Sequence, residues 1–161
     1  MKIVIINGPN LNLLGRREPG IYGTRSMEQV LLEIQHEHMD VHFTYLQSNH
    51  EGDLIDWIQA FGVEHAENNE VTKRQGNKAT GIVLNAGGYT HTSVALRDAV
   101  ACAEVPVVEV HISDITKREE FRRNSLLTGV CAYSIIGKGT SGYSEAVDWI
   151  IEKMKDHKQD V

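Results

Sequence analysis

Short β-branched runs alternate with amphipathic stretches along these 161 residues, and this alternation constrains the fold more than any other feature. The first run, Lys2–Ile6, is continuous and apolar, as expected of a strand buried on both faces. Further strands are expected at Val41–Leu46, Gly81–Leu84, Val105–Val110 and Val130–Ile136. Strands that alternate with helices predict a parallel sheet with helices on both faces, so we expect an α/β fold of three layers.

Helical stretches separate the predicted strands. One begins at Ser26, where Gln29 completes a capping-box pair and apolar residues follow at helical spacing. Further helices are expected around Leu54–Phe61 and over Thr92–Ala103, Lys117–Ser125 and Gly142–Lys155. Residues 64–80 are polar, which indicates a solvated insertion rather than a boundary, so residues 1–161 are expected to form one domain.

Charge and cysteine usage exclude several classes of protein. A formal net charge of −6 leaves no basic surplus for general nucleic-acid binding, although local arginines can still bind a small anion. The two cysteines, Cys102 and Cys131, are too few for a disulfide framework and favour a reducing compartment. The apolar start of MKIVIINGPN is too short for a signal peptide or a membrane span, so we expect a soluble, cytoplasmic protein that binds no membrane.

Polar side chains gather just after the predicted strands. In a parallel sheet these carboxyl ends share one edge, where ligands bind. The residues concerned are Asn7 and Asn10, then Gln47, Ser48, Asn49 and Glu51, then Asn85, and finally His111 and Ser113. Loops are polar in general, but this concentration of amides and histidines favours a binding site.

Glu109 and His111 are the first candidates for chemistry. Residues two apart on a strand share a face, so a carboxylate can lie beside the imidazole and fix its tautomer. Such a histidine can donate a proton near neutral pH. The alternative is a structural, partly buried polar pair.

The loop of residues 14–25 combines arginines, glycines and a proline, a composition typical of a lid. Arg17 and Tyr22 lie within it, and an adjacent guanidinium favours the phenolate form that a tyrosine needs to act as a base. The alternative is a tyrosine that only packs the loop. His91, after the third strand, can hydrogen-bond a ligand hydroxyl or be structural. The GxGxxG stretch Gly137–Gly142 is interpreted as a tight turn, because no further strand follows to supply a ribose-binding acid.

Together these segments resemble the type II 3-dehydroquinate dehydratase family. The matching stretches run in order along the chain: Asn7–Gly15 (NGPNLNLLG), Arg17–Gly23 (REPGIYG), Gln47–Gly52 (QSNHEG), Leu84–Leu96 (LNAGGYTHTSVAL), Glu109–Ser113 (EVHIS), Arg118–Ser125 (REEFRRNS) and Gly137–Tyr143. The resemblance implies a flavodoxin-like fold and a homododecamer built from trimers. It implies reversible anti elimination of water from 3-dehydroquinate through an enolate, in the shikimate pathway, with no cofactor, metal or Schiff base.

The resemblance also implies roles for individual residues. Tyr22 resembles the base and Arg17 the group that activates it, while Asn10 would hold a water on the enolate oxygen. His111, oriented by Glu109, resembles the acid that protonates the departing hydroxyl. The remaining roles concern substrate binding: backbone amides for the substrate carboxylate at Ile112 and Ser113, side chains for the ring hydroxyls at Asn85, His91 and Arg122, and a contact from a neighbouring subunit at Asp98.

Two departures from the family pattern stand out: the long polar insertion at 64–80, and Asp114 where an asparagine is expected. A flavodoxin-like nucleotide- or flavin-binding module is the alternative function. That class needs a hydroxyl-rich phosphate loop after the first strand, whereas this chain has NGPNLNLLG there. A catalytically inactive scaffold is the other alternative.

Overall fold

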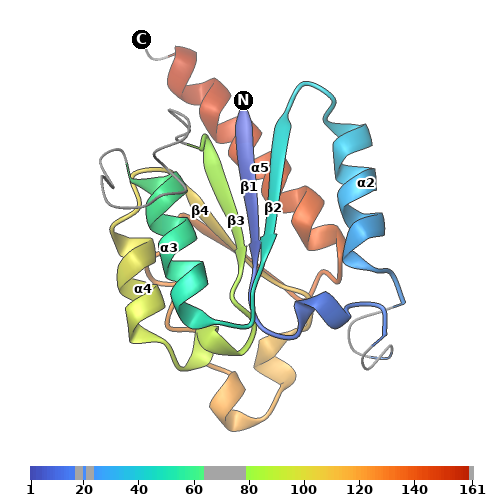
Figure 1. The fold of residues 1–161 in the computed structure, drawn as a ribbon, viewed down its shortest axis with the longest axis vertical. Coiled ribbons are helices and arrows are strands. Elements are labelled where there is room, and N and C mark those ends of the chain that lie inside the picture. The colour runs from blue at the N-terminus through green and yellow to red at the C-terminus, as the bar shows by residue number, and fades with distance from the viewer. Residues whose placement is uncertain (17–19, 21–23, 64–78, 160–161) are drawn as a thin grey trace.

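A five-stranded parallel sheet forms the centre of the molecule in the computed structural model, which describes residues 1–16, 20, 24–63 and 79–159 (Figure 1). The strand order is β2-β1-β3-β4-β5, and every neighbouring pair is parallel. The strands are β1 (Lys2–Asn7), β2 (His42–Gln47), β3 (Gly81–Asn85), β4 (Val107–His111) and β5 (Tyr133–Ile136). All five correspond to the predicted runs, with ends that differ by up to three residues.

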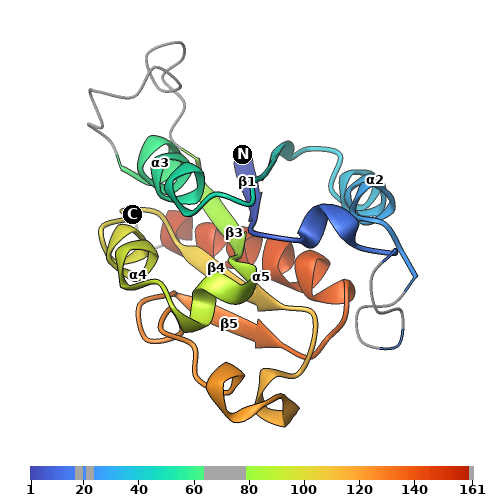
Figure 2. The ribbon, with the colours of Figure 1, turned by 60° about the horizontal axis from the view of Figure 1, so that its bottom comes forward.

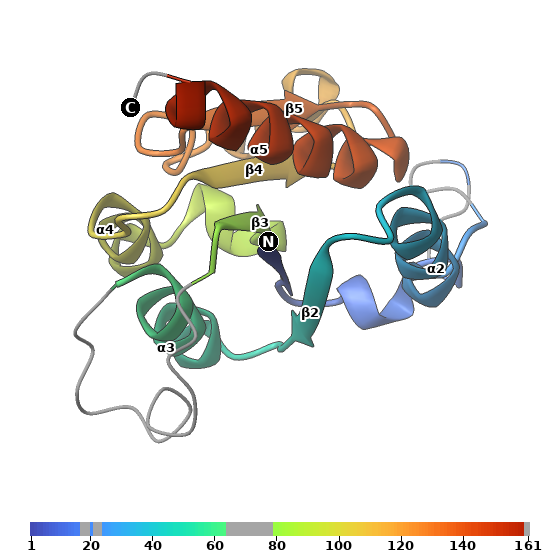
Figure 3. The same ribbon diagram turned by 90° about the horizontal axis from the view of Figure 1, so that it is seen from above.

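Helices cover both faces of the sheet (Figure 3). On one face lie α2 (Met27–Glu37) and α5 (Ser141–Gln159), and on the other lie α3 (Glu51–Gly62) and α4 (Val94–Ala101). Alternate β1 residues divide between the two cores, because Ile3 and Ile5 pack toward α2 and α5 while Val4 and Ile6 pack toward α3 and α4. The predicted three-layer α/β fold of the flavodoxin type is therefore confirmed. No helix in the described ranges is long and apolar enough to cross a membrane.

Hydroxyl caps begin two of the helices. The predicted capping box at α2 is present: Ser26 Oγ accepts from the Gln29 backbone N–H at 3.3 Å, and Gln29 Oε1 accepts from the Ser26 N–H at 2.9 Å. Helix α4 begins two residues later than predicted, at Val94. Ser93 is its N-cap and accepts from the Leu96 N–H at 2.8 Å.

The predicted helix over Lys117–Ser125 is wrong. The chain forms two short 3₁₀ turns instead, η3 (Ile115–Lys117) and η4 (Glu120–Arg122), separated by extended backbone at Arg118. A helix here has no apolar face to bury, since Phe121 is 70% exposed. The charged pattern favours a helix, but without packing it does not stabilise one.

The glycine-rich stretch after β5 is a tight turn, as predicted. Gly137 and Gly139 have left-handed backbone, with φ of 74° and 62°. Their N–H groups donate to the backbone carbonyls of His111 at 2.9 Å and Ile112 at 3.0 Å. The turn therefore anchors the carboxyl end of β4 through backbone hydrogen bonds.

The predicted insertion falls mainly on residues 64–78, outside the described ranges. Where the described chain resumes, Ala79 is buried and its N–H donates to the Phe61 carbonyl at 3.0 Å.

Candidate active site

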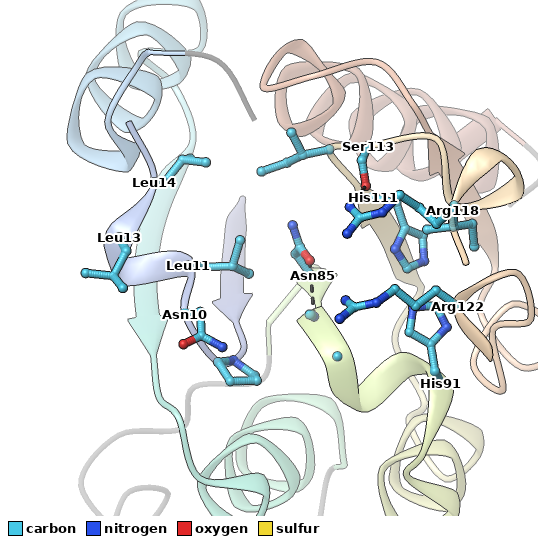
Figure 4. A pocket seen from close by; sticks show the side chains of 15 residues that line it. Asn10, Leu11, Leu13, Leu14, Asn85, His91, His111, Ser113, Arg118 and Arg122 are labelled. Atoms are coloured by element: carbon cyan, nitrogen blue, oxygen red, sulfur yellow. Dashed lines mark hydrogen bonds between the residues drawn. The ribbon is translucent and has the colours of Figure 1, made fainter. Parts of the chain in front are cut away.

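A pocket of about 210 Å³ lies at the carboxyl ends of the strands, the end that Figure 2 turns toward the viewer. Its lining comes from the loops after three strands: Pro9, Asn10, Leu11, Leu13 and Leu14 after β1; Asn85, Gly87, Gly88 and His91 from the end of β3 and the turn η2 (Gly87–His91); and His111, Ile112, Ser113, Ile115, Arg118 and Arg122 from the end of β4 onward. In Figure 4 the β1 loop faces the histidines and arginines across the pocket, with Asn85 between them. Seven of the predicted site residues therefore meet in one cavity.

A carboxylate–imidazole pair stands at the wall of this pocket. Glu109 Oε1 accepts from His111 Nε2 at 2.7 Å, as their two-residue spacing on β4 leads one to expect. Glu109 is fully buried, whereas His111 reaches the pocket. An ionised carboxylate is an acceptor only, so His111 Nε2 carries the donated proton and Nδ1 is not bound by Glu109.

Four hydroxyl groups surround the same carboxylate and form a cage that the sequence analysis missed. Thr90 and Ser125 donate to Glu109 Oε1 at 2.7 and 2.6 Å, and Thr128 and Ser134 donate to Oε2 at 2.7 and 3.0 Å. These residues come from three separate segments, so no sequence spacing marks them as a group. The cage (Thr90, Ser125, Thr128 and Ser134) satisfies a charge that has no access to water.

The cage and the imidazole decide the protonation state of Glu109. Burial disfavours the charged carboxylate, but the hydrogen bond and charge of His111, with the hydroxyls of Ser125 and Thr128, outweigh it. The net result lowers the pKa of Glu109 to about 2. Glu109 is therefore ionised at neutral pH, and its negative charge lies against the His111 ring.

His91 lies beside His111. Their rings stack with centroids 6.4 Å apart and an interplanar angle of 22°. The Nδ1 atom of His91 is 2.8 Å from the Asn124 carbonyl oxygen, which assigns the proton to Nδ1. Its Nε2 atom is then an acceptor when the ring is neutral.

Asn10 lies on the opposite side of the pocket in left-handed backbone, with φ of 67°. Its backbone N–H donates to Asn49 Oδ1 at 3.0 Å. Gln47 also donates to Asn49 Oδ1, at 3.2 Å, and to the Gly8 carbonyl at 3.3 Å. Polar residues at the end of β2 and just after it therefore hold the β1 loop in place.

Two arginines give the pocket positive charge. Arg122 was predicted; its Nε lies 3.5 Å from Glu119 Oε2, and its side chain is 34% exposed. Arg118 lies in the same REEFRRNS stretch and was not predicted to bind substrate, but it also lines the pocket, where it donates to Ser113 Oγ at 3.4 Å. Guanidinium groups are suited to binding carboxylates.

Four predicted residues do not line the described pocket, and of these Glu109 is fully buried and bound to His111. Tyr22 and Arg17 lie outside the described residues. Asp98 is on an exposed part of α4, where its carboxylate lies 3.4 Å from Arg97, and it does not line the cavity.

The fold and the pocket define the class of protein: an α/β enzyme with a carboxylate–imidazole pair and cationic side chains at the carboxyl edge of a parallel sheet. A sequence model of the family described as dehydroquinase class II matches residues 1–151. The chain belongs to this family.

Relatives and solved structures agree. The chain is 46% identical to the 3-dehydroquinate dehydratase of an Exiguobacterium species over 158 residues, which cover 97% of this chain and 98% of the relative. It is 44% identical to that of Halothermothrix orenii, with 96% of each chain covered. The crystal structure of type II dehydroquinase from Butyrivibrio crossotus superposes with a TM-score of 0.79 at 42% identity, covering 93% of this chain and 97% of the other. These matches give no support to the alternative of a nucleotide- or flavin-binding module.

Proposed function

We propose that the chain dehydrates 3-dehydroquinate by reversible anti elimination through an enolate. The observation that carries this proposal is the fully buried, ionised Glu109 bound at 2.7 Å to a histidine that reaches an arginine-containing pocket. An elimination of this kind needs an acid to protonate the departing hydroxyl and a base on the other side of the substrate. The choice of 3-dehydroquinate as the substrate rests on the relatives that are named 3-dehydroquinate dehydratase.

In this proposal His111 is the acid and delivers the proton from Nδ1, because Nε2 is occupied by Glu109. Tyr22 is the base and Arg17 stabilises its phenolate. Asn10 holds a water on the enolate oxygen; its place in the lining, across the pocket from His111, supports this role. The acid then comes from the end of β4 and the base from the loop of residues 14–25, and anti elimination requires that they act on opposite faces of the substrate.

The remaining polar residues of the lining bind the substrate. Its carboxylate rests on the backbone amides of Ile112 and Ser113, close to Arg118. Asn85, His91 and Arg122 order the ring hydroxyls. No metal, cofactor or Schiff base takes part.

We further propose that residues 1–161 act as one catalytic domain in a homododecamer of trimers, in the cytoplasm, within the shikimate pathway. Asp98 reaches the site of a neighbouring subunit, which fits its exposed place on α4 outside its own pocket. The reducing compartment fits the two free cysteines. Burial first, and then the charge of Glu109, raise the pKa of the Cys131 thiol, which stays protonated.

An absorbance assay of the enone product, run on 3-dehydroquinate, tests the function, and Tyr22→Phe tests the base. The wild type is expected to turn over, and Tyr22→Phe to lose about a thousandfold or more in kcat with KM within about tenfold. Tyr133→Phe is the matched control, because Tyr133 lies on β5, stacks on Trp149 and does not line the pocket. An inactive wild type refutes the proposed function; near-normal kcat in Tyr22→Phe removes only the base.

A further inference from the structure

A line of hydrogen-bonded polar side chains, most of them buried, lies behind Asn85. Asn85 Nδ2 donates to the Tyr143 hydroxyl at 2.9 Å, and that hydroxyl donates to Asn7 Oδ1 at 2.8 Å. Asn7 Nδ2 in turn contacts the Tyr45 hydroxyl at 3.4 Å. Of these residues only Asn85 lines the pocket, while Asn7 and Tyr143 are fully buried.

The fold explains why these groups meet. Asn7 and Asn85 are direct register partners at the carboxyl ends of β1 and β3. Tyr143, in the first turn of α5, packs against this end of the sheet, within the core that α5 shares with β1 and β3. Its ring fills apolar space, and its hydroxyl meets two amides that are shielded from water.

The donors and acceptors along this line of side chains determine which group donates each hydrogen bond. A tyrosine hydroxyl has one proton, and burial raises the pKa of Tyr143, so the group stays neutral and keeps it. Because that proton is donated to Asn7, the hydroxyl can offer only a lone pair to Asn85, which must present its NH₂ group. The other end of the Asn85 amide agrees, since Oδ1 accepts from the Gly87 N–H at 3.2 Å. The Gly87 N–H can only donate, so it excludes the flipped amide by itself, and the hydrogen bond to the Tyr143 hydroxyl agrees with this orientation.

We propose that Tyr143 is a positioning residue for substrate binding, which acts through Asn85 and fixes which end of that amide faces the ligand. Asn85 then offers its second Nδ2 hydrogen to a substrate oxygen in one set orientation. This inference rests on the proposed function, in which Asn85 binds the substrate. Its effect belongs to binding rather than to proton transfer, because Glu109 and His111 make no contact with Tyr143 in the hydrogen bonds described above.

A double-mutant cycle with Tyr143→Phe and Asn85→Ala tests the proposal. Tyr143→Phe keeps the ring and removes the hydroxyl, so KM for 3-dehydroquinate is expected to rise about tenfold while kcat stays within about threefold. Added to Asn85→Ala, the same change should alter KM by less than about twofold, because the amide that it orients is gone. Tyr45→Phe is the matched control: it removes a hydroxyl that contacts Asn7 but not Asn85, and KM should stay within about twofold.

The outcomes separate this proposal from others. Three results would show that Tyr143 is only a structural residue. They are additive losses in the double-mutant cycle, a fall in kcat at constant KM, and an effect of Tyr45→Phe as large as that of Tyr143→Phe. If Tyr143→Phe does not fold, Asn7→Ala replaces it, since Asn7 lies outside the pocket and holds the Tyr143 proton. Asn7→Ala should raise KM through the same amide, and an unchanged KM overturns the proposal. A wild type that does not act on 3-dehydroquinate refutes the proposed function itself.

Discussion

Two charged parts of the site differ in how their charges are held: one is buried and fully hydrogen-bonded, and the other is partly exposed to solvent. The Glu109–His111 pair lies on β4, an interior strand, with a fully buried carboxylate that accepts five hydrogen bonds of 2.6 to 3.0 Å. The arginine segment, residues 115–123, is a pair of 3₁₀ turns in which Arg122 faces Glu119 at 3.5 Å and is partly exposed. A buried charge that loses its hydrogen-bond partners costs much free energy of folding. An exposed ion pair contributes little to stability and is screened by salt.

This difference suits the Glu109–His111 pair and the arginine segment to different functions. Proton transfer needs a group held in one tautomer and one orientation, which the buried pair provides. Attraction of an anionic substrate needs only net positive potential at the mouth, which partly exposed arginines provide at low cost in folding. Substitutions in the buried part should therefore affect kcat and stability, and those in the arginine segment KM and its salt dependence.

The largest effect is expected from the pair itself. His111→Ala should lower kcat by about a thousandfold, because it removes the acid. Glu109→Gln should lower kcat by about a hundredfold at most, since the imidazole remains but loses its charged partner. Steady-state kinetics on 3-dehydroquinate measures both. Small and equal losses in the two variants would show that the pair is only structural.

The next effect concerns acid stability. The pKa of Glu109 is lowered from 4.5 to about 2 in the folded protein, so its ionised form stabilises the fold above pH 4.5. This contribution, on the order of 3 kcal/mol at 1.36 kcal/mol per pKa unit, should be lost as the pH falls from about 4.5 to about 2. Urea unfolding between pH 7 and pH 3 measures it. Glu109→Gln should show a shallower decline than the wild type, and the exposed-site control Glu152→Gln should not; parallel curves for Glu109→Gln and the wild type would refute the assignment.

The strands and the Glu109–His111 pair could be predicted from the sequence because both depend on local spacing. The two-residue spacing of Glu109 and His111 predicted that both side chains lie on the same face of a strand. Runs of β-branched residues predicted the strands of the sheet. The cage was out of reach, because Thr90, Ser125, Thr128 and Ser134 meet only through the fold. The bond from Tyr143 to Asn7 spans 136 residues, so it has no local signal either.

The helix predicted over 117–125 failed for a different reason. Its charge pattern suits a helix, but helices of this length depend on burying an apolar face. With Phe121 exposed, side-chain contacts decide the backbone instead: Asp114 accepts from the Thr116 N–H at 3.0 Å, and Arg123 Nε donates to the Arg118 carbonyl at 2.9 Å. Local propensity is therefore least informative in the segment that carries the arginines.

A smaller effect should follow from the cage. Thr128→Val and Ser134→Ala each remove one hydroxyl from Glu109 Oε2 and should lower the free energy of unfolding by about 1–2 kcal/mol. Chemical unfolding at pH 7 measures the loss. Ser141→Ala is the matched control, because its exposed hydroxyl also makes a short bond, 2.7 Å to the Lys138 carbonyl, and should cost less than about 0.5 kcal/mol. Equal costs at all three positions would mean that burial of the acceptor is not what gives the cage its strength.

The smallest effect is expected in the arginine segment. Arg122→Gln should raise KM about fivefold and leave kcat within about twofold, because a partly exposed guanidinium contributes only about 1 kcal/mol to binding an anion. The loss should also depend on salt: raising ionic strength from about 0.05 to about 0.5 M shortens the Debye length and should increase KM in the wild type more than in the variant. Lys153→Gln makes the same charge change on α5, away from the pocket lining, and should leave KM and its salt dependence as in the wild type. If Arg122→Gln instead lowers kcat by a hundredfold at unchanged KM, the arginine takes part in the chemical step, and the division between a buried pair for proton transfer and a partly exposed arginine segment for attraction fails.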